Sequence, residues 1–210
     1  MRGKFIVVEG PDGAGKTTLV NNLVDLLKKQ GIKTIKTREP GGSSIGADIR
    51  RLLFDKTRNM DNVTNALLVS AERRHHLQTL IEPYLDQGYW VICDRYILST
   101  YVYQGMNEQV RTIVKEAIRE HRLPDLTFLL FALTGAAIDR LIKRGDLNHF
   151  DALTPEEYNE RINQYNKVPP EEYTQAVETL LPVDWEPDDI AQWALTKLEL
   201  RFGECDTDGC

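Results

Sequence analysis

Short continuous runs of apolar residues recur along the chain, and longer stretches with apolar positions at helical spacing separate them. The short runs predict buried strands at 4–9, 32–37, 89–93, 126–133 and 176–181. The periodic stretches predict helices at 17–30, 47–53, 62–86, 110–118, 136–144, 154–167 and 187–200. Because strands alternate with helices, we expect an α/β fold with helices on both faces of a five-stranded parallel sheet.

A glycine-rich turn separates the first predicted strand from the first predicted helix. Residues 10–18 read Gly-Pro-Asp-Gly-Ala-Gly-Lys-Thr-Thr and fit the pattern G-x-x-x-x-G-K-[ST]. Backbone N–H groups in such a loop wrap phosphate oxygens, and the following helix N-terminus adds partial positive charge. We therefore predict a P-loop NTPase-type three-layer sandwich that binds ATP or GTP, with a chance glycine turn as the alternative. The predicted loop contacts are Gly10, Gly13, Ala14, Gly15, Lys16, Thr17 and Thr18.

Net charge, the length of apolar runs and the number of cysteines argue against several classes of protein. The formal net charge of −6 argues against a bulk electrostatic grip on DNA or RNA, but a few arginines suffice for a small anion. The sequence lacks the run of about 18 apolar residues that a membrane span needs. Its three cysteines do not make a disulfide framework, so we expect a reducing, cytoplasmic environment.

No internal repeat or interdomain linker interrupts the chain, so we expect one domain over residues 1–203 and a disordered tail at 204–210. A set of arginines follows the predicted loops, and the Asn-Lys-x-Asp motif typical of GTP switches is missing from the sequence. Phosphoryl transfer needs positioning and positive charge around two phosphorylated ligands. The arginines in question are Arg38, Arg73, Arg95, Arg140 and Arg144.

Four motifs, taken together in order and spacing, resemble those of the thymidylate kinase family. They are the glycine loop, Thr37-Arg38-Glu39-Pro40-Gly41-Gly42, Asp94-Arg95-Tyr96, and the segment 140–145 that opens a lid at about 144–153. The similarity runs from about residue 3 to about residue 165. The resemblance implies ATP as phosphoryl donor with Mg²⁺, dTMP as acceptor, a contact between Arg140 and ATP, and a homodimer through helices near 62–86 and 107–122.

The resemblance also implies a role for several acceptor-side residues. Asp12 would bond the 3′-hydroxyl of the acceptor, Arg38 would hold its phosphate, and Arg73 would read its base. A turn-forming aspartate, a loop arginine and a solvated helix face are the respective alternatives. His75 and His76, beside Arg73, are interpreted as helix-surface histidines.

Further expectations concern the end of the third strand and the residues after it. Asp94 would face the metal together with Thr17, and Arg95 would face the acceptor phosphate; a strand-capping ion pair is the alternative. Tyr103 would pack against the deoxyribose, unless it is a core aromatic. Polar neighbours of the base are expected at Ser99, Thr100 and Gln104.

Two features suggest how this chain varies within the family. Gly13 occupies the loop position that is basic in one form of the family, so the sequence resembles the bacterial-type form, in which Arg144 of the lid closes over the transferring phosphoryl group. We count Lys16, Asp94, Arg95 and Arg144 as the catalytic set. Val69 stands where the family usually has a phenylalanine that stacks on the base. Either another aromatic residue takes its place, or the base preference differs.

The function expected from these features is ATP-dependent phosphorylation of dTMP to dTDP, without a nucleic acid polymer or a membrane as partner. A kinase of the same fold that acts on dUMP, a 5-modified deoxyuridylate or another nucleotide or nucleoside is the first alternative. A nucleotide-dependent switch or binding module is the second. An anion site around Arg38 and Arg95 would argue against a switch, which needs no second phosphate pocket.

Overall fold

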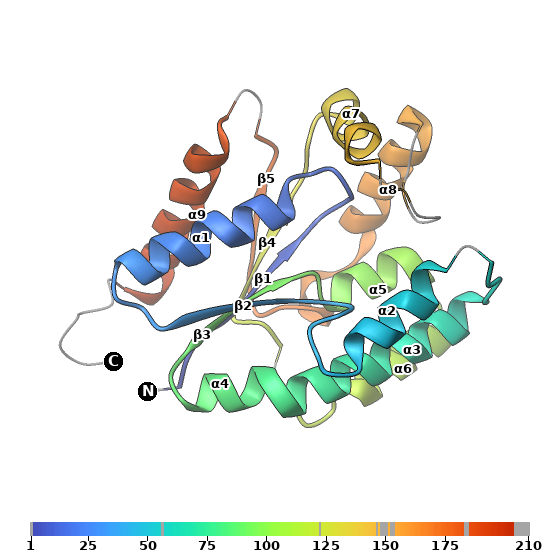
Figure 1. The fold of residues 1–210 in the computed structure, drawn as a ribbon, viewed down its shortest axis with the longest axis horizontal. Coiled ribbons are helices and arrows are strands. Elements are labelled where there is room, and N and C mark those ends of the chain that lie inside the picture. Colours follow the sequence, from blue (N-terminus) through green and yellow to red (C-terminus); the bar gives the residue numbers. More distant parts are fainter. Residues whose placement is uncertain are drawn as a thin grey trace.

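Five parallel strands form the central layer of the computed structural model (Figure 1). It describes residues 2–55, 57–121, 123–145, 147, 151, 154–182 and 185–203, so the predicted tail and much of the predicted lid lie outside the described residues. The strands are β1 (Phe5–Glu9), β2 (Thr34–Arg38), β3 (Trp90–Asp94), β4 (Leu126–Leu130) and β5 (Val177–Leu180). Their order across the sheet is β2-β3-β1-β4-β5, which confirms the expected α/β fold.

Helices connect the strands and cover both faces of the sheet (Figure 1). The helices are α1 (Lys16–Lys29), α2 (Gly46–Phe54), α3 (Asn62–His76), α4 (Glu82–Asp86), α5 (Ile97–Gln104), α6 (Glu108–Ala117), α7 (Thr134–Arg144), α8 (Pro155–Lys167) and α9 (Pro187–Phe202). A π-helical turn η1 (Leu77–Ile81) joins α3 to α4, and a 3₁₀ turn η2 (Pro170–Glu172) precedes β5. None of the helices in the described part of the chain is long and apolar enough to cross a bilayer.

The central strand β1 contributes alternate side chains to two cores. Ile6 and Val8 pack with α1 and α9 on one face of the sheet. Phe5 and Val7 pack with α3, η1 and α5 on the other. This alternation follows from the period of two along a strand and makes β1 a continuous apolar run. Its carboxyl end is thereby fixed between both layers, and the glycine loop begins there.

The predicted elements are present, with ends shifted by a few residues, and one helix was missed. The second predicted strand begins later, at Thr34, and the fourth ends earlier, at Leu130. The long helix predicted at 62–86 is continuous but contains the π-helical turn. Helix α5 was not predicted, although it carries several of the residues singled out for the site.

Candidate functional site

The glycine loop connects β1 to α1 and has the backbone geometry that its glycines permit. Gly13 and Gly15 have φ values of 78° and 95°, in the left-handed region. A Cβ at Gly13 would also lie 2.5 Å from the carbonyl oxygen of Ala137, so α7 packs directly against the loop. Helix α1 begins at Lys16, with the loop's last glycine as its N-cap. The first N–H groups of α1 therefore open onto the loop.

Lys16 lies inside this loop rather than in solvent. Its side chain is buried, and its Nζ donates to the carbonyl oxygen of Pro11 at 2.7 Å. Burial, and secondly the positive charge of Arg95, lower the pKa of Lys16 to about 8. An anion bound in the loop would offset both effects and restore the charge.

A pocket beside the glycine loop, the glycine-loop pocket, brings together most of the residues predicted for phosphate and metal binding. Its lining residues are Asp12, Gly13, Gly15, Lys16, Thr17, Thr18, Arg38, Glu39, Arg50, Asp94, Arg95, Arg140, Leu141 and Arg144. Within it the Thr17 hydroxyl donates to Asp94 Oδ2 at 2.6 Å. Of the other loop residues, Gly10 accepts from Arg95 through its carbonyl, and Ala14 lines a separate pocket described below.

A second pocket, the helical pocket, lies between the loop after β2 and helices α2, α3 and α5. Its lining residues are Asp12, Glu39, Pro40, Arg50, Leu53, Phe54, Val69, Arg73, Arg95, Tyr96, Ser99, Thr100, Tyr103, Gln104 and Arg144. The residues predicted to contact the acceptor line this pocket, except Arg38, which lines the glycine-loop pocket alone. The two pockets share Asp12, Glu39, Arg50, Arg95 and Arg144.

Arg95 ties the walls of the two pockets together. Its guanidinium donates to Asp12 Oδ1 at 2.6 Å, to the Gly10 carbonyl at 3.0 Å and to the Tyr165 hydroxyl at 2.8 Å. It does not form the strand-capping pair with Asp94 considered above, because Asp12 is its carboxylate partner. Its backbone has a φ of 72°, a conformation that costs a non-glycine residue about 1–3 kcal/mol and is typical of functional sites.

Asp12 and Tyr103 complete this arrangement. The Tyr103 hydroxyl donates to Asp12 Oδ2 at 2.6 Å. Burial alone would raise the pKa of Asp12, but the positive charges of Arg95 and Lys16 hold it well below its ordinary value. Asp12 is therefore an anion that pairs across the loop, and Tyr103 is a partly exposed pocket residue rather than a core aromatic.

Arg73 is buried, which contradicts the alternative of a solvated helix face. Its side chain is 1% exposed; Nε donates to Glu39 Oε2 at 2.7 Å, and Nη2 donates to Thr100 Oγ1 at 3.0 Å. Its Nη1 is buried and has no hydrogen-bond partner among the described residues. Arg73 also lines the helical pocket, so its unused donor belongs to a residue of that pocket.

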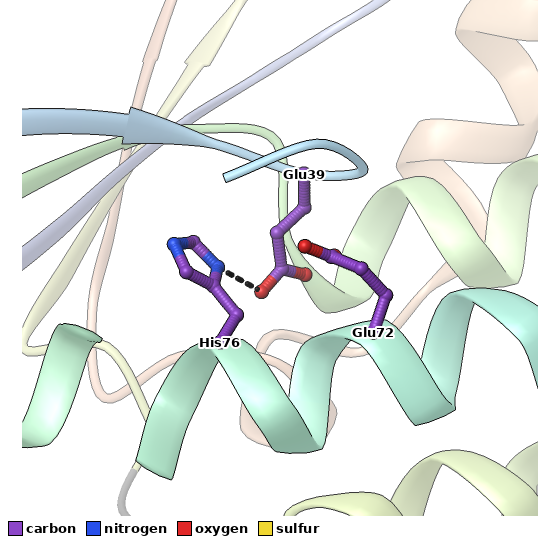
Figure 2. A group of neighbouring side chains, drawn as sticks. All are labelled: Glu39, Glu72 and His76. Carbon is purple, nitrogen blue, oxygen red and sulfur yellow. Dashed lines mark hydrogen bonds and ion pairs between the residues drawn. The ribbon is translucent and has the colours of Figure 1, made fainter. Parts of the chain in front are cut away.

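The surface interpretation of His76 was wrong, because it belongs to a buried cluster with Glu39 and Glu72 (Figure 2). His76 Nδ1 lies 3.0 Å from Glu39 Oε1, and its Nε2 lies 2.6 Å from Thr37 Oγ1. Ligand atoms of the three residues lie within 4.8 Å of one another, close enough to hold a cation. The two oxygens of Glu39 are already bonded to Arg73 and His76. We therefore interpret the cluster as a structural support that holds the Arg73 side chain in place. His75 is half-buried and contacts Ser44.

Glu72 has one satisfied and one unsatisfied oxygen. Oε1 accepts from the Ser43 backbone N–H and hydroxyl, at 3.2 and 3.0 Å. Oε2 is buried and has no hydrogen-bond partner among the described residues. Burial, and secondly the negative charge of Glu39, raise the pKa of Glu72. The folded protein therefore holds the Glu72 proton more tightly than the unfolded chain, so this group's stabilisation is lost as the pH rises through its folded pKa.

We expect Glu72→Gln to stabilise the protein, and by more at pH 8 than at pH 5.5. The amide keeps an acceptor for Ser43 and removes the buried carboxyl, whose ionised form is disfavoured by burial and by the negative charge of Glu39. Urea denaturation at both pH values measures the difference in the free energy of unfolding. The exposed Glu171→Gln is the matched control and should change stability by less than about 0.5 kcal/mol. A loss of stability at both pH values would contradict the expectation.

A third pocket, the outer pocket, is formed by the glycine loop, helices α1, α7 and α9, and the segments that follow β4 and β5. Its lining residues are Ala14, Gly15, Thr18, Leu19, Ala132, Leu133, Ala136, Arg140, Pro182, Trp185, Glu186, Pro187 and Ile190. Arg140 lines both this pocket and the glycine-loop pocket and donates to the Gly13 carbonyl at 3.0 Å. The outer pocket therefore continues from the loop into a more apolar surface that includes Leu133 and Trp185.

Arg144 reaches the rim of both inner pockets from the last turn of α7. Its guanidinium donates to both carboxylate oxygens of Asp151, at 3.0 and 2.9 Å, and its side chain is 43% exposed. Residues 146, 148–150 and 152–153 of the predicted lid lie outside the described residues. Arg144 thus brings a positive charge to both inner pockets, and much of its side chain is exposed to solvent.

Three features of the site were missed in the sequence. Arg50 lines both inner pockets, and burial followed by the charges of Arg38 and Arg95 lowers its pKa to about 10. Glu9 is buried and accepts from Tyr96 N and Ser99 N, at 2.7 and 3.1 Å, at the start of α5. The residues of the outer pocket beyond Pro182 lie in a segment without a recognisable motif. For Arg50, its place on the short helix predicted at 47–53 was a usable signal.

Known proteins resemble this chain over most of its length. The family model described as thymidylate kinase matches residues 8–184. A thymidylate kinase of Caldicellulosiruptor saccharolyticus is 44% identical over 155 residues, which cover 72% of this chain and 75% of the relative. One from Exiguobacterium sibiricum is 42% identical, with 72% and 74% covered, and one from Nitrosomonas eutropha is 36% identical, with 78% and 77% covered.

Proposed function

The chain belongs to the thymidylate kinase family, and we infer from this membership that it phosphorylates dTMP to dTDP with ATP as the donor. It is a phosphotransferase with a P-loop NTPase-type fold. The roles of individual residues below are our proposal, and each is supported by the contacts described above.

One observation carries the proposal most directly: two pockets meet at three shared arginines. Arg50, Arg95 and Arg144 line both the glycine-loop pocket and the helical pocket. A kinase of this kind must hold two phosphate-bearing molecules end to end, with positive charge where the phosphates meet. A switch has no need of a second pocket beyond the phosphates. The geometry therefore favours a kinase over a nucleotide-dependent switch.

On the donor side, we assign the phosphates of ATP to the glycine-loop pocket and its adenine to the outer pocket. Lys16 and the N–H groups of Gly13, Gly15 and Thr18 would contact the phosphates. Arg140 supports this assignment because it lines both pockets, where it can lie between the phosphates and the base.

On the acceptor side, we assign dTMP to the helical pocket. Arg73 offers a buried, unused donor, which suits a carbonyl of the base. Tyr103 and Asp12 would contact the sugar, and Arg38, Arg95 and Arg50 would surround the phosphate at the junction of the pockets. Polar contacts from Ser99, Thr100 and Gln104 would complete the pocket.

The residues present fit a magnesium ion that accompanies ATP. The hydroxyl of Thr17 and the carboxylate of Asp94 lie 2.6 Å apart, and both are the hard oxygen ligands that Mg²⁺ prefers. We propose that these two residues would hold the ion. When bound, Mg²⁺ neutralises phosphate charge during transfer.

A panel of acceptors tests the function. Purified protein with excess Mg·ATP should release ADP when dTMP is added, and more slowly with dUMP, dCMP, dGMP or thymidine. The readout is acceptor-dependent ADP formation in a coupled assay. Faster turnover of dUMP or another member of the panel would replace dTMP with that acceptor, and ADP release that no acceptor changes would remove the kinase assignment.

We expect binding of Mg·ATP at pH 8 to take up protons because of Lys16. With a pKa of about 8, this group is about half neutral at that pH, and the phosphates would restore its charge. Calorimetric titration in two buffers of different ionisation enthalpy measures the uptake. Lys16→Arg, which stays charged, is the control and should lose the part of the uptake due to Lys16. Equal uptake by both proteins would contradict the expectation.

We further propose a homodimer and a cytoplasmic location. Helices α3 and α6, which correspond to the predicted dimer helices, pack against each other, and Leu67 on α3 is 53% exposed. The buried, unpaired Cys93 thiol suits a reducing compartment. Sedimentation equilibrium at micromolar concentration tests the dimer, and a monomer under those conditions would contradict it.

A further inference from the structure

The hydroxyl group of Tyr165 bridges the glycine loop and the guanidinium of Arg95. Tyr165 lies on α8, which packs against α5 and α7 (Figure 1). Its hydroxyl donates to the carbonyl oxygen of Gly10 at 2.8 Å and accepts from Arg95 Nη1 at 2.8 Å. Tyr165 lines neither the glycine-loop pocket nor the helical pocket, whereas Arg95 lines both. Any influence of Tyr165 on a bound nucleotide must therefore act through Arg95 or through the loop.

The bridge is anchored in buried, closely packed parts of the protein. Gly10 has a φ of 140°, and a Cβ there would lie 2.0 Å from the Leu130 carbonyl oxygen, so the loop backbone packs directly against β4. Tyr165 is 1% exposed. Burial raises the pKa of Tyr165 to about 12, so the hydroxyl keeps its proton at neutral pH and can donate to Gly10. The protein interior therefore fixes the position of the oxygen that Arg95 meets.

Removal of this hydroxyl would leave each of its partners with another hydrogen bond. Arg95 Nη1 also donates to the Gly10 carbonyl and to Ser99 Oγ, at 3.0 and 2.8 Å. Its Nη2 donates to Asp12. The Tyr165 hydroxyl is therefore not needed to satisfy buried polar groups, but it restricts where the guanidinium can lie between the two pockets. The strained backbone of Arg95 is of the kind that persists where surrounding contacts impose it.

We propose that Tyr165 is a positioning residue for phosphoryl transfer, which holds the Arg95 guanidinium at a fixed place beside the glycine loop where the two pockets meet. This inference rests on the proposed function, in which Arg95 lies at the acceptor phosphate. The rate of transfer depends steeply on alignment, since a displacement of about 1 Å can cost about 10²-fold. Binding depends on alignment less, because the attraction between a cation and a phosphate falls off slowly with distance.

Tyr165→Phe tests the proposal because it removes the hydroxyl oxygen and keeps the ring. We expect kcat with Mg·ATP and dTMP to fall by about 5- to 50-fold, while the KM values for dTMP and ATP stay within about threefold of the parent. In an Arg95→Lys background, which has already lost the guanidinium, the same substitution should lower kcat by less than about twofold. Thermal unfolding checks that the variants remain folded.

Tyr158→Phe is the matched control, because it makes the same change on the same helix. Tyr158 is 0% exposed, and its hydroxyl has no hydrogen-bond partner among the described residues. It lines neither inner pocket, so its kcat should stay within about twofold of the parent.

Three results would overturn the proposal. They are an unchanged kcat in Tyr165→Phe, an equal loss in Tyr165→Phe and Tyr158→Phe, and a full additional loss from Tyr165→Phe in the Arg95→Lys background. A parent protein that does not phosphorylate dTMP would instead overturn the proposed function, so the two failures are distinguishable.

Discussion

Arg144→Ala is expected to lower kcat by about 10³- to 10⁵-fold, the range that such an arginine contributes to phosphoryl transfer. The guanidinium lies at the junction of the glycine-loop and helical pockets, where charge develops on the transferring group. Its carboxylate partner Asp151 has a side chain that is 0% exposed, so removing the guanidinium should also lower stability, because a buried carboxylate loses this cationic partner. Steady-state kinetics with Mg·ATP and dTMP, together with thermal unfolding, measure both effects.

Lys143→Ala is the matched control for this substitution. Lys143 is the preceding residue of α7, is exposed and does not line either inner pocket. We expect its kcat to remain within about twofold of the parent, because it brings no charge to the junction. Near-normal kcat in Arg144→Ala, or an equal loss in both variants, would remove Arg144 from the catalytic set.

Arg73→Ala is expected to destabilise the protein by about 3–5 kcal/mol, because it leaves the buried carboxylate of Glu39 without its cationic partner. Arg73 and Glu39 are each 1% exposed, and their atoms meet at 2.7 Å. The same substitution should weaken dTMP binding, since Nη1 is the proposed donor to the base. Urea denaturation gives the free energy of unfolding, and calorimetry gives the affinity where the variant is folded.

The neighbouring residue gives a direct comparison. Arg74 lies on the same helix, is 41% exposed, and meets Glu120 at 3.7 Å. An exposed pair of this kind contributes about 0–1 kcal/mol, so Arg74→Ala should stay close to the parent. If both substitutions cost the same small amount, Arg73 does not hold the buried cluster together.

The sheet and most helices could be predicted because their apolar positions have a clear period. Helix α5 could not, because it is buried on nearly every side. Its buried residues include Leu98, Thr100, Tyr101 and Gln104, so no polar stripe marks its phase. The start of strand β2 was predicted two residues early, at 32 instead of Thr34. Strand β2 lies at the edge of the sheet and pairs with one neighbour only, so its sequence defines its first residue poorly.

The site was predictable where a local motif dictates its backbone, and unpredictable where charged residues neutralise one another through long-range contacts. The glycine loop is one segment, so its spacing alone identifies it. Glu72, Arg73 and His76 read locally as a charged, solvated helix face, yet all three are buried. Arg73 and His76 pair with Glu39, far away in sequence, and Glu72 accepts from Ser43. Only the packing of α3 against the loop after β2 distinguishes these residues from the partly exposed Arg74.

The arginines that both inner pockets share have a consequence for how the two nucleotides influence each other. The phosphate groups of the nucleotide that binds first neutralise the positive charge of these arginines. The second nucleotide is then attracted less strongly. Electrostatics by itself therefore makes donor and acceptor mutually antagonistic, and reciprocity requires the same factor in either order of addition. If one nucleotide raises the affinity for the other, the cause must be side chains that the first nucleotide has already ordered, because the second then binds at a lower cost in entropy.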